Sequence, residues 1–163
     1  MRRSGDLTDG GWSCLGGAGD IRRRANLYFD DTPGLTVPEM KGKLRRLDYV
    51  DLVVVDYLQL MTGTRKTDNR VNEISEITRN LKVMAKELNV PVIALSQLRR
   101  ATDRTKDRRP GLSELRDSGS IEQDADLVLF LHRPYYNIHS EGGEITQDVD
   151  RNAAPIMLAN NRH

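Results

Sequence analysis

The sequence predicts an α/β fold in which a mostly parallel β-sheet carries helices on both faces. Three short apolar runs are typical of its strands: Leu52–Val55, Val92–Leu95 and Leu127–Leu131. A continuous apolar run indicates a strand that is buried on both faces, as in a parallel sheet. Stretches with helical periodicity separate the runs, and this alternation of strands and helices also favours parallel pairing.

Polar side chains follow each apolar run at the point where the strand is expected to end. Asp56 follows the first run, Gln97 closely follows the second, and His132 follows the third. Right-handed crossovers would bring the carboxyl ends of the strands to one edge of the sheet, which is where ligands bind in this fold class. We therefore expect Asp56, Gln97 and His132 to share that edge.

Asp56 has the most specific chemistry of these residues. An ionised carboxylate at the end of a buried strand needs water or a cation, because its desolvation is costly. Four apolar residues followed by Asp are typical of a Walker B strand, whose carboxylate holds Mg²⁺ beside a nucleoside triphosphate. On this pattern alone, Asp56 could instead cap a turn or the next helix. The next residues, Tyr57–Met61, are interpreted as packing residues.

The segment before the first strand is less regular. Residues 1–25 are rich in Gly and charge and predict helix fragments or a frayed start, with Trp12 as the only large anchor. Leu27–Phe29 predicts a short strand. The run Thr36-Val37-Pro38-Glu39 combines a capping-box pattern with an early Pro, which predicts a helix that continues to about Leu47.

The segments after the first strand alternate between loops, helices and strands. A polar loop is expected at 62–69, and apolar residues at three- and four-residue steps predict an amphipathic helix from Val71 to Leu88. Residues 99–109 are too charged to pack and predict a loop over the same sheet edge. A second capping-box pattern at Ser120–Gln123 predicts the start of a short helix. A last strand is expected to begin at Ile156–Ala159.

Length and composition indicate one globular domain. The chain has 163 residues, of which 37% are hydrophobic and 30% are charged. No apolar run approaches the roughly 20 residues of a membrane span, so we expect no membrane partner. The single Cys14 cannot form an internal disulfide, which fits a reducing compartment, and we expect a cytoplasmic location.

Five stretches of the sequence, taken together, form a specific pattern: FDDTPGLT (29–36), LVVVDYLQLMTG (52–63), NRVNEISEITRNLKVMAKELNVPVIALSQLRRA (69–101), RRPGLSELRDSGSIEQDADLVLFLHR (108–133) and LANNRH (158–163). The run LRDSGSIEQDAD after LSQL is its most specific part. This pattern resembles one family, the C-terminal motor domain of replicative DNA helicases of the DnaB type, which has the RecA-like fold. The resemblance implies that residues 1–163 form one partial RecA-like ATPase domain.

For a nucleotide site, the resemblance implies roles for three residues, with ATP and Mg²⁺ as cofactors. Asp56 is similar to the Mg²⁺-coordinating Walker B aspartate, and Gln97 to the glutamine that senses the γ-phosphate. Arg162 is similar to the arginine finger that reaches the nucleotide of a neighbouring, identical subunit in a homohexamer. The family has Lys where this chain has Asn160, and an amide cannot supply that charge.

For DNA, the resemblance implies that residues 99–119 form a binding region for single-stranded DNA. Arg116, Asp117 and Gly119 stand where the family holds the phosphate backbone, although the family usually has Glu at Asp117. A guanidinium can pair bidentately with phosphate, and a Gly can bring a backbone N–H close. Alternatively, Arg116 pairs with Glu114 or Asp117 on a surface helix. A primase or a helicase loader is a further partner that the resemblance implies.

The sequence contains no G-x-x-x-x-G-K-[ST] motif, which would cradle the phosphates. We therefore expect an internal portion of a motor domain that has negligible ATPase activity by itself. The function that the resemblance implies is ATP-driven translocation on single-stranded DNA with duplex unwinding. Two alternatives remain: another RecA-like ATPase, such as a recombinase, and a non-catalytic remnant that binds single strands or subunits.

Overall fold

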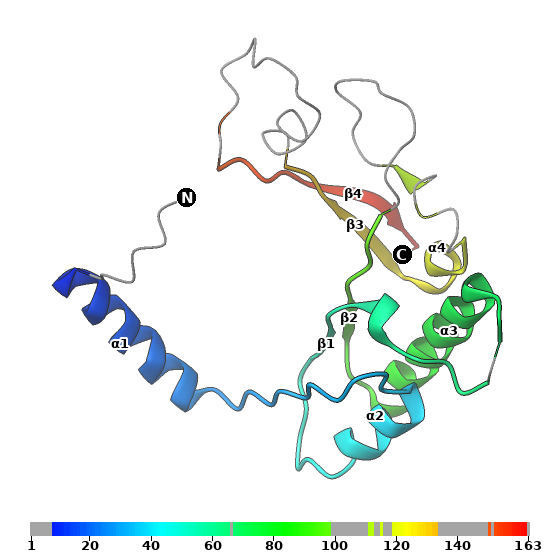
Figure 1. Ribbon diagram of the computed structural model, residues 1–163, viewed down its shortest axis with the longest axis horizontal. Coiled ribbons are helices and arrows are strands. Elements are labelled where there is room, and N and C mark those ends of the chain that lie inside the picture. The colour runs from blue at the N-terminus through cyan, green and yellow to red at the C-terminus, as the bar shows by residue number, and fades with distance from the viewer. Residues whose placement is uncertain are drawn as a thin grey trace. The chain divides into compact units, whose positions relative to one another are not determined.

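The computed structural model describes residues 8–65, 67–98, 111–112, 115, 119–133, 150 and 152–162. The chain divides into two units, Met1–Thr32 and Pro33–His163. Figure 1 labels the α-helices and strands, which are α1 (Asp9–Arg24), α2 (Val37–Leu44), β1 (Val53–Val55), α3 (Arg70–Leu88), β2 (Val92–Ala94), α4 (Gly119–Asp124), β3 (Leu127–Leu131) and β4 (Ile156–Asn161). A short 3₁₀ helix, η1 (Leu58–Leu60), lies between β1 and α3 along the chain.

The first unit contains α1 and the segment that follows it. α1 is one helix of 16 residues, so the expectation of fragments or a frayed start is wrong for Asp9–Arg24. Trp12 is 61% exposed and is therefore not the anchor that the sequence suggested. The strand predicted at Leu27–Phe29 is also wrong, because residues 26–30 join no ladder and the described strands pair only with one another. Because no described strand pairs with this segment, its backbone N–H and C=O groups make no inter-strand hydrogen bonds.

The second unit opens with α2, which begins as its capping box predicts. The Thr36 hydroxyl accepts a hydrogen bond from the Glu39 N–H at 3.4 Å, and the Glu39 carboxylate accepts one from the Thr36 N–H at 2.9 Å. The helix ends at Leu44, slightly earlier than expected, and Arg45 caps it. Val37 is buried and joins a core with residues of β1 and α3.

β1 and β2 pair in parallel, as the sequence predicts, with Val53 opposite Val92 and Val55 opposite Ala94. Val53 and Val55 are buried in the core that α2 and α3 also line. Val54, which points to the other side of β1, is 57% exposed. The expectation that this run is buried on both faces is therefore wrong. In the part of the chain that the structure describes, helices cover only one face of this strand pair.

α3 supplies most of that core and has well-formed ends. The Asn69 side-chain oxygen caps the first turn, because it accepts hydrogen bonds from the N–H groups of Val71 at 2.9 Å and Asn72 at 3.4 Å. Asn89 ends the helix in the left-handed conformation, with φ 52°, which asparagine tolerates better than most residues. Burial of each core side chain stabilises the fold by about 1.5–3 kcal/mol. The buried apolar residues of α3 are Ile74, Ile77, Leu81 and Met84.

β3 and β4 form a separate, antiparallel strand pair. The last strand is confirmed, and it extends to Asn161. The expectation that Leu127–Leu131 joins the same parallel sheet is wrong for the described residues, because the ladder of β3 is formed with β4 rather than β2. His132 therefore does not share a strand ladder with Asp56 and Gln97. It is buried, and its N–H donates to the Pro155 carbonyl at 3.1 Å.

β3 faces a second, smaller core on one side only. Val128 and Phe130 are buried there together with Leu115. The side chains that alternate with them remain exposed, and Leu129 is 60% exposed. This alternation indicates a strand that is covered on one face within the described residues, although its apolar sequence predicts two covered faces.

α4 packs against α3 (Figure 1). It begins at Gly119, which confirms the short helix that the second capping-box pattern predicts before β3, although Ser120 lies inside the helix instead of at its N-cap. The Ser120 hydroxyl instead forms a hydrogen bond with the Ser75 hydroxyl of α3, at 2.9 Å.

The predicted α/β class with parallel strands is confirmed. Among the described helices, none is both long enough and apolar enough to cross a membrane.

Candidate functional site

The parallel register of β1 and β2 brings two of the predicted site residues to the same edge. Asp56 follows β1 directly, and Gln97 lies three residues after the end of β2. The ladder continues past the strands, since the Leu95 N–H donates to the Val55 carbonyl at 2.9 Å. Both side chains are exposed. The shared edge is thus confirmed for Asp56 and Gln97, whereas the role of each remains a prediction.

Gln59 of η1 links the ends of the two strands, which the sequence interpretation missed. Its side-chain amide donates to the Ser96 hydroxyl at 3.0 Å, and its oxygen accepts the Gln97 N–H at 3.4 Å. The neighbouring Leu58 and Met61 are buried, which confirms their interpretation as packing residues, whereas Leu60 is 58% exposed and the interpretation is wrong for it. The sequence signal that could have identified Gln59 is its amide side chain, which lies between apolar residues that pack in the core.

The residues at this edge fit one part of a magnesium–nucleotide site. Mg²⁺ in such sites takes one or two carboxylates and keeps water or phosphate oxygens as its other ligands. Asp56 is exposed at the carboxyl end of β1 and can supply one such oxygen. Across the described ranges, no group of three or more His, Cys, Asp or Glu side chains that could hold a metal ion occurs. Asp56 therefore suits a metal that a bound phosphate helps to hold.

The predicted DNA-binding region is only partly placed. Residues 99–110, 113–114 and 116–118 lie outside the described residues, and Arg116 and Asp117 are among them. Leu115, directly before Arg116, is 6% exposed and packs with Val128 and Phe130. Gly119 is the first residue of α4. Leu115 and Gly119, on either side of positions 116–118, therefore belong to packed structure.

A row of polar contacts attaches α4 and the turn after it to α3. The Ser75 and Ser120 hydroxyls are hydrogen bonded, and the Thr78 hydroxyl donates to the Asp124 carboxylate at 2.6 Å. One turn further along α3, Lys82 forms an ion pair with Asp126. These contacts give the two aspartates of the IEQDAD run a structural role that the sequence reasoning missed. The available signal was the three- and four-residue spacing of Ser75, Thr78 and Lys82 beside the apolar stripe.

Arg162 lies just after β4 and contacts its own chain. Its guanidinium donates to the Gln123 carbonyl, and its N–H donates to the Asp126 carbonyl at 3.1 Å. Asn160 lies opposite Val128 in the β3–β4 ladder. The structure thus places Arg162 against the turn between α4 and β3. Its predicted role as an arginine finger concerns a neighbouring subunit and stays a prediction.

The loop that follows η1 is attached to α3 by two glutamates. The Gly63 N–H donates to the Glu73 carboxylate at 2.9 Å, and Arg70 forms an ion pair with the same carboxylate. The Gly63 N–H, with Arg70 in second place, lowers the pKa of Glu73 below its ordinary value. One turn later, the Glu76 carboxylate accepts hydrogen bonds from the Thr64 N–H and hydroxyl. The loop is therefore held close to the first turns of α3.

Comparisons with known proteins converge on one family. The family model described as "DnaB-like helicase C terminal domain" matches residues 1–163. The chain is 47% identical over 152 residues to the replicative DNA helicase DnaC of Bacillus subtilis (strain 168), covering 90% of this chain and 34% of that protein. It is 50% identical over 166 residues to the replicative DNA helicase DnaB of Mycobacterium leprae (strain TN), covering 99% of this chain and 26% of that protein.

Solved structures give the same match. One of them, described as an "ATPase Domain", has a TM-score of 0.80 and 36% identity, with 96% of this chain and 55% of that chain covered. Another, described as "The Structure Of A DnaB-Like Replicative Helicase And Its Interactions With Primase", has a TM-score of 0.74 and 34% identity, with 94% and 39% covered. The chain spans about a quarter to a third of the length of the curated relatives it matches.

Proposed function

Because the chain belongs to the DnaB-like helicase C-terminal domain family, we propose that it works as part of a motor that couples ATP hydrolysis to translocation on single-stranded DNA and duplex unwinding. The observation that carries this proposal is the parallel pairing of β1 with β2. That pairing brings Asp56 and Gln97 to one edge of the sheet, where α/β proteins bind nucleotides.

At this edge, Asp56 would hold Mg²⁺ and Gln97 would contact the γ-phosphate of ATP. The bound metal neutralises charge that develops on the phosphate oxygens. Gln59 contacts both Ser96 and the Gln97 backbone, so it fixes the end of β2 relative to η1. Gln97 directly precedes the segment that leads to the predicted DNA-binding region. This order along the chain supports a role in relaying the state of the nucleotide to the DNA.

For DNA, we assign the phosphate contacts to Arg116, Asp117 and Gly119. The support is the position of this segment between buried Leu115 and α4, which is attached to α3 through side chains on both helices. If its two neighbours are held in this way, such a segment would transmit force from the protein to the DNA strand. Because backbone contacts carry no sequence information, binding should be independent of base sequence and sensitive to salt.

The absent phosphate-cradling motif favours a second candidate function for the isolated chain, non-catalytic binding of single-stranded DNA or of helicase subunits. We propose that ATP hydrolysis requires residues that this sequence does not contain. In the assembled motor, we propose identical subunits in a homohexamer as partners, with Arg162 reaching a neighbouring nucleotide. A primase or a loader is a further proposed partner, and the cytoplasm the proposed location.

A titration of labelled single-stranded DNA tests the proposal. Arg116→Ala should weaken binding by about tenfold and should lower the salt dependence of log K by about 0.7, the value for one lost phosphate contact on a single strand. The matched control is Arg46→Ala, since Arg46 is exposed and distant in sequence from the predicted DNA region. Equal affinity for the Arg116 variant and the unmodified chain would contradict the assignment. A steady-state phosphate-release assay on the 163-residue chain should show negligible turnover.

A further inference from the structure

The turn between α4 and β3, residues 123–126, holds Arg162 in place. The Arg162 N–H donates to the Asp126 carbonyl at 3.1 Å, and this bond continues the β3–β4 pairing beyond the last residue of β4. The Arg162 guanidinium donates to the Gln123 carbonyl. A hydrogen bond from a charged donor is stronger than one between neutral groups. Arg162 therefore has a defined position within its own chain.

The contact with the turn leaves Arg162 able to bind a phosphate. Its side chain makes one hydrogen bond and no ion pair to the described residues, and it is exposed. A guanidinium carries several N–H donors in a fixed fork. Arg162 can therefore keep its bond to the turn while its other donors pair with an anion.

Side chains of α3 hold the same turn. The Thr78 hydroxyl donates to the Asp124 carboxylate at 2.6 Å, and Thr78 is buried. One turn further along α3, Lys82 forms an ion pair with Asp126. Asp126 is thus contacted by α3 through its carboxylate and by Arg162 through its carbonyl. A displacement of the turn relative to α3 would therefore change the environment of Arg162.

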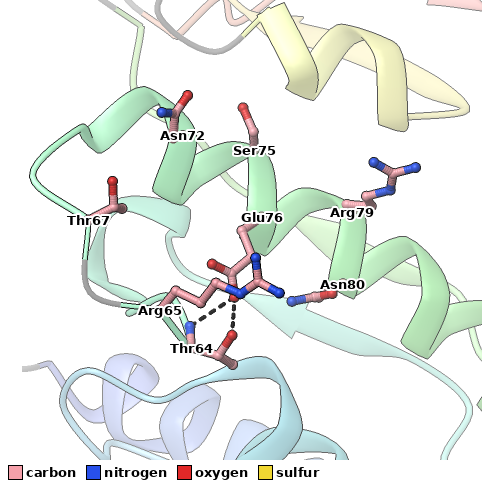
Figure 2. A pocket seen from close by; sticks show the side chains of 8 residues that line it. All are labelled: Thr64, Arg65, Thr67, Asn72, Ser75, Glu76, Arg79 and Asn80. Atoms are coloured by element: carbon pink, nitrogen blue, oxygen red, sulfur yellow. Dashed lines mark hydrogen bonds between the residues drawn. The ribbon is translucent and has the colours of Figure 1, made fainter.

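The other end of α4 carries part of the predicted DNA-binding segment. Gly119 is the first residue of α4, and the Ser120 hydroxyl is hydrogen bonded to the Ser75 hydroxyl at 2.9 Å. Figure 2, a view of the polar pocket beside α3, shows Ser75 directed from α3 toward α4. Packed helices respond to a ligand by small sliding movements, and a short helix moves as one body. A movement imposed at Gly119 would therefore reach the turn that holds Arg162.

We propose that α4 couples the DNA-binding segment to Arg162, with Thr78 and Lys82 as positioning residues that hold the α4–β3 turn on α3. DNA bound at Gly119 shifts this turn, and Arg162 shifts with it. The inference rests on the proposed roles of Gly119 and Arg162, and it adds a connection between them that does not pass through Gln97.

The test follows Arg162 by NMR in the ¹⁵N-labelled 163-residue chain during a titration with oligo(dT). The Arg162 N–H lies in the hydrogen bond to Asp126, so its resonance reports a shift of the turn. The resonance should move with the same midpoint as binding measured on labelled oligo(dT). Thr78→Val and Lys82→Ala should each reduce this movement by about half or more. Thr78→Ser keeps the hydroxyl and should retain the movement.

The salt dependence of binding separates positioning from direct contact with DNA. Thr78 is buried, so Thr78→Val should leave the salt slope unchanged, whereas Arg116→Ala should lower it by about 0.7. The matched control Thr62→Val should change neither the slope nor the Arg162 resonance. Lys82→Ala guards against loss of folding, since the ion pair that it removes is partly exposed and contributes little to stability. Thermal unfolding of each variant sets a titration temperature at which all of them are folded.

The outcomes separate this coupling from the DNA-binding function itself. If oligo(dT) binds but the Arg162 resonance does not move, or moves equally in the unmodified chain, Thr78→Val and Lys82→Ala, the coupling is overturned and the proposed function stands. If Thr78→Ser loses as much movement as Thr78→Val, the role of the hydroxyl is overturned. If the unmodified chain shows no salt-dependent binding, the coupling and the DNA-binding function are both overturned.

Discussion

Replacing Thr78 by Val would test whether the polar row between α3 and α4 stabilises the fold. Thr78 is 8% exposed, and its hydroxyl donates to the Asp124 carboxylate at 2.6 Å. Val has nearly the same shape as Thr, so the substitution removes the hydrogen bond without leaving a cavity. A hydrogen bond to a charged group is worth about 1.5–3 kcal/mol. Because Asp124 is only half-buried, water can partly replace the lost donor, and we expect a loss of about 1–2 kcal/mol.

Urea and thermal unfolding, followed by circular dichroism, measure this loss. For a chain of this size, the expected loss lowers Tm by about 2–8 °C. The matched control is Thr62→Val, since Thr62 is exposed and its side chain makes no hydrogen bond to any described residue. The control should change the free energy of unfolding by less than about 0.5 kcal/mol.

A double-mutant cycle decides whether the effect arises from this contact. Asp124→Ala should destabilise the chain, and Thr78→Val should add little once Asp124 is absent. The coupling free energy should be about 1 kcal/mol. If the two substitutions add independently, or if Thr78→Val costs no more than the Thr62 control, the assigned role of the row is refuted.

Three further substitutions give quantitative expectations. Thr36→Ala removes the capping hydroxyl of α2 and should cost about 1 kcal/mol in urea unfolding, whereas Thr36→Ser should cost little. Met84→Ala opens a cavity at a side chain that is 1% exposed and should cost about 2–5 kcal/mol; a loss below about 1 kcal/mol would show that the site collapses freely. Since its folded-state pKa is depressed, Glu76 stabilises the chain at pH values above its ordinary pKa of 4.5, and this contribution is lost as the pH falls. Glu76→Gln should therefore lower stability more at pH 7 than at pH 3, and an equal effect at both pH values would contradict this reasoning.

The sequence predicted well those features that depend on neighbours along the chain. The spacing of apolar residues located α3, and Thr36 with Glu39 located the start of α2, because both signals are read within a few residues. The parallel pairing of β1 with β2 also followed, since the helix between them requires a crossover. That pairing was enough to bring Asp56 and Gln97 to one edge.

The failures concern contacts between distant segments. Ser120 has the local pattern of a helix cap, but its hydroxyl contacts Ser75 in the structure. Gln59 bridges to Ser96 across 37 positions, which no local pattern encodes. Burial on both faces was wrong for β1 because an apolar run does not by itself determine which of its faces other segments cover. Only one of those surfaces is covered by the described part of this chain.

Among the described residues, the exposed apolar sides of β1 and β3 determine how this chain must be handled. The side chains of Val54 and Leu129 are exposed to water. An exposed apolar surface of this kind binds molecular chaperones and also hydrophobic fluorescent dyes such as ANS. Ammonium sulfate should precipitate the chain at low concentrations, because excluded salts strengthen apolar contact between molecules. Light scattering that rises with added sulfate and falls in mild urea would reveal this surface without any ligand.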